Sequence, residues 1–69
     1  MPAINVTING DPREVPPGLT VEGLLEFLGI IPGRVAIECN LDILTRAHWK
    51  ERYVQPGDTF EIVNFVGGG

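Results

Sequence analysis

The sequence predicts an α+β fold in which one amphipathic helix packs across a single mixed sheet. Residues 3–9, 35–40 and 59–65 alternate between apolar and polar side chains, as half-buried strands do. A helical apolar stripe follows Thr20. With 69 residues, 43% of them hydrophobic, the chain has room for one core, so the stripe is expected to be buried against the sheet.

An N-terminal hairpin is predicted for residues 3–15. The dipeptide Asn9-Gly10 favours a two-residue turn, because both residues accept a positive φ angle. The returning strand runs through Pro12 to Val15, and Pro16-Pro17-Gly18 ends it. The first two strands are therefore expected to be antiparallel neighbours.

A short helix is predicted to follow the hairpin. Thr20 is a favourable N-cap, and Glu22 lies in the first turn, where a negative charge interacts well with the helix dipole. Gly29 favours the end of the helix. The residues of the apolar stripe are spaced as one helix face requires, and they are Val21, Leu24, Leu25 and Leu28.

The second half of the chain begins with a strand at residues 35–40, which places Cys39 on the apolar face. We interpret Cys39 as a buried core thiol and not as a nucleophile, because no histidine lies near it in the sequence to act as a base. Residues 40–42 are expected to turn into a very short strand at Ile43-Leu44.

The segment before the last strand has the weakest pattern. Thr45 is expected to cap a short helical turn over residues 46–50. Residues 55–58 form a strong turn signal, and the last strand is predicted for residues 59–65, with Phe60 and Ile62 on one face. The remaining aromatic and histidine side chains are expected in the core or at its rim (Trp49 and Tyr53) and on the surface (His48).

Composition excludes several classes of function. The net charge of -4 disfavours binding to nucleic acid or to anionic lipid. One cysteine cannot form an internal disulfide, and with a single histidine it cannot build a structural zinc site. The longest nearly apolar stretch, residues 21–32, is too short to cross a membrane, and the N-terminus shows no targeting pattern. A monomeric cytoplasmic protein is the expectation.

The C-terminal end carries the clearest functional signal. We expect residues 1–66 to form the domain and residues 67–69, Gly67-Gly68-Gly69, to form a flexible tail. A segment without side chains is thin enough to enter a narrow channel in another protein, where the carboxylate of Gly69 would be the reacting group. A frayed terminus or a cloning remnant is the alternative explanation.

Three segments resemble one known family. They are Val35-Ala36-Ile37-Glu38-Cys39-Asn40, Trp49 placed before Gln55-Pro56-Gly57-Asp58, and the ending Glu61-Ile62-Val63-Asn64-Phe65-Val66-Gly67-Gly68-Gly69. Together they resemble the ubiquitin-like sulfur carriers, and among these the ThiS family of thiamine biosynthesis. The resemblance covers essentially the whole chain, and it implies the β-grasp fold, a mixed sheet around one helix.

The resemblance implies a carrier cycle. A ubiquitin-activating-type adenylyltransferase would use ATP to adenylate the carboxylate of Gly69, and sulfur from a persulfide donor would displace AMP to leave a thiocarboxylate. Thiazole synthase would then take the sulfur. Gly67 and Gly68 would enter the active sites of the partners, while Val66, and less readily Phe65, would help docking. The chain would be a cosubstrate and not an enzyme, with no bound cofactor or metal.

Three other functions remain open at this point. A sulfur carrier for molybdopterin or another pathway would need the same glycine tail. A protein modifier would join Gly69 to a lysine through an isopeptide bond. A binding module with an idle tail would keep its function after Gly68-Gly69 is deleted.

Overall fold

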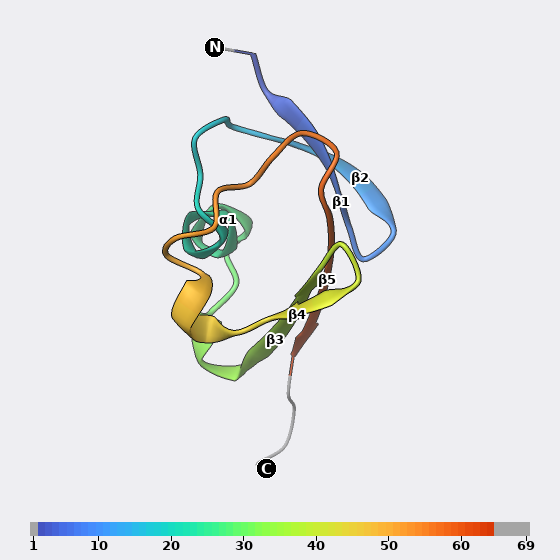
Figure 1. Ribbon diagram of the computed structural model, residues 1–69. Coiled ribbons are helices and arrows are strands. Elements are labelled where there is room, and N and C mark those ends of the chain that lie inside the picture. Colours follow the sequence, from blue (N-terminus) through green and yellow to red (C-terminus); the bar gives the residue numbers. More distant parts are fainter. Residues whose placement is uncertain (1, 65–69) are drawn as a thin grey trace.

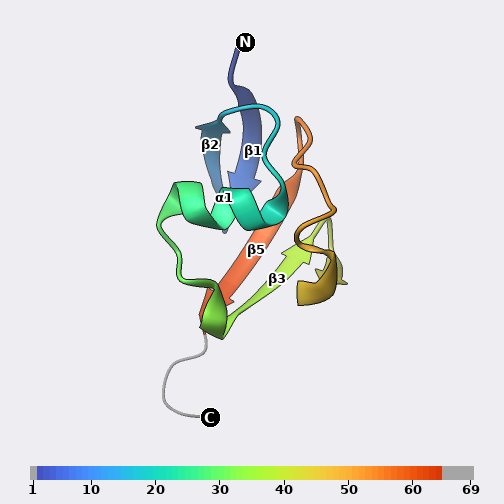
Figure 2. The same ribbon diagram turned by 90° about the vertical axis from the view of Figure 1, so that its left-hand side faces the viewer.

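The computed structural model describes residues 2–64, and it confirms the predicted α+β architecture. A five-stranded mixed sheet has the strand order β2-β1-β5-β3-β4. Within the described residues the single α-helix crosses one face of this sheet (Figures 1 and 2). The elements are β1 (Ile4–Ile8), β2 (Asp11–Val15), α1 (Val21–Leu28), the 3-10 turn η1 (Pro32–Arg34), β3 (Val35–Cys39), β4 (Asp42–Leu44), the 3-10 turn η2 (Arg46–His48) and β5 (Thr59–Asn64).

The central position of β5 defines the sheet. It pairs parallel with β1 and antiparallel with β3, whereas β1–β2 and β3–β4 are antiparallel pairs. The predicted turn between β1 and β2 is confirmed, because Asn9 and Gly10 both have positive φ angles of 51° and 84°. The two hairpins therefore lie on either side of β5. The N-terminal part of β5 pairs with β1 and so joins the two hairpins into one sheet.

The helix begins and ends where the sequence predicts. The Thr20 side chain accepts a hydrogen bond from the Gly23 N–H at 3.1 Å, and Gly29 adopts the left-handed conformation at the C-terminal end. Leu24 and Leu25 are fully buried against the sheet. Burial of these large side chains stabilises the fold by roughly 2 kcal/mol each, which outweighs the low stability of an eight-residue helix alone.

The core forms between α1 and the inner face of the sheet. Cys39 is buried there as a free thiol, as predicted, and Trp49 is also buried. The indole N–H of Trp49 donates to the Leu44 carbonyl at 3.0 Å, so its polar atom is satisfied. His48 lies on the surface as predicted, but Tyr53, expected in the core or at its rim, is 55% exposed. The other buried apolar residues are Val6, Ile8, Val15, Val21, Leu24, Leu25, Val35, Ile37, Val54, Phe60 and Ile62.

The structure corrects the segment between β3 and β5. Thr45 occupies the predicted N-cap position of η2, but its hydroxyl makes no capping bond to the backbone and lies instead 2.8 Å from Nδ1 of His48. The helical turn is also shorter than predicted, ending as a 3-10 turn at His48. The hydroxyl of Thr45 therefore has a side-chain partner three residues away in place of a backbone N–H group. Strand β4 begins one residue earlier than predicted, at Asp42.

Candidate functional site

The candidate site begins where β5 ends at Asn64. Asn64 pairs with Val35, the first residue of β3, so this end of β5 lies beside η1. The predicted site residues follow directly, and they lie outside the described residues: Phe65, Val66, Gly67, Gly68 and Gly69. Their roles and the domain boundary at residues 66–67 therefore remain predictions.

Strand β5 is held in place by its pairing with β3, by burial in the core and by the side chain of Asn9. Five residue pairs join it to β3, and Phe60 and Ile62 are buried in the core. Asn9 adds a side-chain clamp: its amide nitrogen donates to the Ile62 carbonyl at 3.2 Å, and its amide oxygen accepts from the Ile62 N–H at 2.7 Å. The clamp continues the pairing beyond the end of β1, so β5 is a rigid base for the residues that follow.

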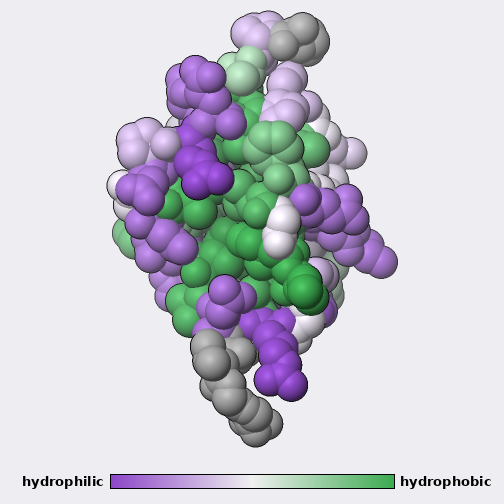
Figure 3. All heavy atoms as spheres, turned by 180° about the vertical axis from the view of Figure 1, so that it is seen from behind, coloured by the Kyte–Doolittle hydropathy of each residue, from purple (hydrophilic) through white to green (hydrophobic). Residues whose placement is uncertain are grey.

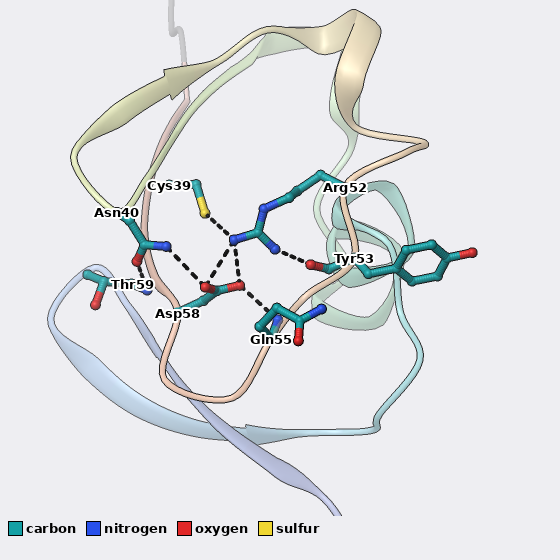
Figure 4. Close-up of polar contacts among 7 residues, drawn as sticks. All are labelled: Cys39, Asn40, Arg52, Tyr53, Gln55, Asp58 and Thr59. Atoms are coloured by element: carbon teal, nitrogen blue, oxygen red, sulfur yellow. Dashed lines mark hydrogen bonds and ion pairs between the residues drawn. The ribbon is translucent and has the colours of Figure 1, made fainter.

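A second polar cluster fixes the turn that leads into β5 (Figure 4). Asp58 is buried and forms an ion pair with Arg52, with Nη2 3.0 Å from both carboxylate oxygens. The same carboxylate accepts from the Gln55 N–H at 2.8 Å and from the Asn40 side chain at 3.1 Å. The turn after β3 and the connection between η2 and β5 are thus joined at one carboxylate immediately before β5 begins.

The thiol of Cys39 belongs to this cluster but is not poised for nucleophilic chemistry. Burial raises the pKa of Cys39, although Arg52 opposes this effect with Nη2 3.3 Å from the sulfur. The thiol form is therefore favoured at neutral pH. Burial acts to raise the pKa of Asp58 too, but hydrogen bonds from Arg52, the Gln55 N–H and Asn40 outweigh it, and the pKa is lowered. Asp58 is therefore ionised at neutral pH.

Other types of site find no support in residues 2–64. Among these residues no group of three or more histidine, cysteine or acidic side chains is placed to hold a metal ion. Across the same part of the chain, no helix combines the length and the apolar character that a membrane crossing requires.

Exposed apolar residues lie on both sides of the sheet. On the helix side, Phe27 and Ile31 are 52% and 82% exposed. Figure 3, which views the molecule from behind, shows a broad apolar surface between more polar margins. On the opposite face of the sheet, Val63 is 56% exposed. Exposed apolar surface of this kind is typical of protein contact sites.

Comparison with known proteins establishes the family. A model of the ThiS family matches residues 6–69. The chain belongs to the ThiS family. A solved relative, the thiamine biosynthesis protein ThiS of Geobacter metallireducens, is 36% identical, with a TM-score of 0.80 over 96% of this chain and 100% of that one. This agreement confirms the β-grasp, ubiquitin-like fold for this ThiS-family chain.

Two longer relatives carry a different name. A thiazole synthase of Magnetococcus marinus is 38% identical over 66 residues, and one of Paramagnetospirillum magneticum is 41% identical over 66 residues. Each alignment covers 96% of the ThiS-family chain and 20% of the relative. The chain therefore spans about a fifth of the length of these two thiazole synthases.

Two features of the site were not predicted from the sequence. The Asn9 clamp was missed because the turn preference of Asn-Gly explained the residue fully, and its contact with Ile62 spans 53 positions. The Arg52–Asp58 pair was missed because neither residue belongs to a periodic element. An aspartate at the end of the 55–58 turn was the one available signal for the latter.

Proposed function

We propose that this ThiS-family chain is a sulfur carrier of thiamine biosynthesis, which carries sulfur as a thiocarboxylate on Gly69. The observation that supports this most is the extent of the family match, which continues through residue 69 and so includes Gly67 and Gly68. The fold of the described residues fits the role, because β5 is a rigid base for a segment that must enter another protein.

The chemistry follows from the low reactivity of a carboxylate. The Gly69 carboxylate attacks the α-phosphate of ATP on an adenylyltransferase, and pyrophosphate leaves. The terminal sulfur of a persulfide then attacks the acyl carbon of the adenylate, and AMP leaves. A thiol cleaves the resulting sulfur–sulfur bond, which gives the thiocarboxylate and a disulfide. The partners supply the catalytic groups, so the chain acts as a cosubstrate.

Thiazole synthase is the proposed acceptor of the sulfur. Two relatives with this name contain a segment that aligns with 96% of the chain, which supports a functional link between carrier and synthase. In this proposal Gly67 and Gly68 pass through the narrow entrance of each partner, and Phe65 and Val66 contact its rim.

Intact-mass analysis tests the proposed function. The chain is incubated anaerobically with ATP, the adenylyltransferase of its organism and a persulfide donor. The expected product has one oxygen replaced by sulfur, and it forms only with ATP. A variant without Gly68-Gly69 is the control and is expected to stay unmodified. Conjugates with lysine-containing proteins in place of this product would show a protein modifier and contradict the proposal.

A further inference from the structure

The face of the sheet that points away from α1 has an unusual charge arrangement. Figure 1 shows the helix on one side of the sheet and, within the described residues, no element covering the other side. On that side Glu38 of β3 lies directly opposite Glu61 of β5. Both side chains are exposed, because their neighbours along each strand point into the core. We call this surface the outer sheet face, formed by Ala36, Glu38, Ile43, Glu61 and Val63.

The two carboxylates are not neutralised within the domain. Like charges directly opposite on neighbouring strands destabilise a sheet. Over residues 2–64 the ion pair found is the Arg52–Asp58 pair, which involves neither glutamate. The cross-strand neighbour of Glu38 on β4 is the apolar Ile43, and not a lysine or arginine. A cation placed between Glu38 and Glu61 would therefore remove a repulsion that the free chain carries.

Apolar side chains flank this carboxylate pair. Ile43 is 77% exposed and Val63 is 56% exposed. The combination fits a lysine or arginine side chain well, because its charged head can lie between two carboxylates while its aliphatic stem packs on apolar neighbours.

The outer sheet face lies close to the C-terminal end of β5, from which Gly69 must reach its partner. Glu61 lies three residues before Asn64, or about 10 Å along the strand. The residues after Asn64 span at most about 17 Å when fully extended. An enzyme that holds Gly69 in its active site must therefore bring its own surface close to this end of β5.

We propose that the outer sheet face docks onto a surface of thiazole synthase that presents lysine or arginine side chains between Glu38 and Glu61, with Ile43 and Val63 at the apolar rim. The inference rests on the proposed function, because it takes thiazole synthase as the partner. It adds the surface and the chemistry by which the folded domain is recognised.

Calorimetric titration of the chain into thiazole synthase from its organism tests the proposal. Glu38→Lys and Glu61→Lys are each expected to weaken Kd on the order of tenfold, with the loss smaller at high salt. Glu26→Lys is the matched control, because it makes the same change of charge on α1, on the other side of the sheet. Its Kd is expected to stay near that of the wild type.

Thermal unfolding shows that the variants act on docking and not on folding. Glu38→Lys converts the repulsive pair with Glu61 into an attractive one, so its Tm is expected to rise by about 2–5 °C. A variant that is more stable and yet binds less tightly supports the proposal.

Other outcomes separate this inference from the proposed function. Tight binding of the wild type with equal binding of both lysine variants would overturn the outer sheet face as the docking site. A loss of binding confined to Ile31→Ser would overturn it too, and would place the contact on the helix side. Failure of the wild type itself to bind would reject thiazole synthase as partner, whatever the variants do.

Discussion

The carboxylate of Asp58 is expected to be the most important polar group for the stability of the domain. Asp58→Ala removes the ion pair with Arg52 and two hydrogen bonds, from Asn40 and from the Gln55 N–H. Breaking a buried ion pair costs about 3–5 kcal/mol. The Arg52 side chain keeps 29% of its surface exposed, so water replaces part of the lost contact and we expect the lower end, about 3 kcal/mol.

Thermal unfolding followed by circular dichroism measures this loss. For a domain of this size 1 kcal/mol shifts Tm by about 4–8 °C, so Asp58→Ala is expected to lower Tm by about 12–24 °C. Asp58→Asn keeps an acceptor for the Gln55 N–H and should lose less. Asp42→Ala, which removes an exposed carboxylate from β4, is the matched control and should change Tm little.

The stability difference between the wild type and Asp58→Asn is expected to depend on pH. Because the pKa of Asp58 is lowered in the folded state, its stabilisation is fully present above the unfolded pKa of about 3.9 and is lost as pH falls through the folded pKa. The difference in free energy of unfolding between wild type and Asp58→Asn should therefore be constant near neutral pH and narrow in acid. A small Tm change for Asp58→Ala, or a difference that does not narrow in acid, would refute the importance given to this carboxylate.

Four further predictions use other parts of the chain. Asn9→Gly keeps the turn but removes the clamp, so the free energy of unfolding should fall by about 1–2 kcal/mol and amide exchange at Ile62 should accelerate; unchanged exchange would contradict the clamp. Leu41→Gly should raise Tm, because Leu41 has a φ angle of 75° and is 89% exposed, and relief of left-handed strain contributes about 1 kcal/mol. Cys39 should resist alkylation by iodoacetamide until the domain unfolds, and Cys39→Ala should still accept sulfur in the intact-mass assay. Gly68→Ala should slow sulfur loading with Tm unchanged, and a large fall in Tm would count against a tail separate from the core.

The sequence predicted the fold well where local signals and burial agree. Alternation identified β1, β3 and β5, and the cap at Thr20 with the left-handed Gly29 defined α1. These signals depend on neighbours in the sequence, so they can be recognised without tertiary contacts. The segment around Thr45 lacks apolar periodicity, and there a hydroxyl that caps a helix in one context bonds His48 in another.

The candidate site, too, was predicted from the sequence only in part. The glycine tail was recognised from composition and family resemblance, and Gly69 remains a prediction because it lies outside the described residues. The pairing of Glu38 with Glu61 depends on strand register, which the alternation of residues does not define. The Arg52–Asp58 pair depends on how an irregular segment folds back, which no periodic pattern encodes.

The place of β5 between β1 and β3 has a consequence for synthesis of the chain. Both neighbours precede β5 in the sequence, so a growing polypeptide exposes two unpaired strand edges until residues 59–62 have emerged. Phe60, which has no exposed surface in the finished domain, arrives at the same late moment. Nascent chains that stop short of this strand should thus be open to proteases and prone to aggregate, and a partner should encounter the folded body only after translation has passed Ile62.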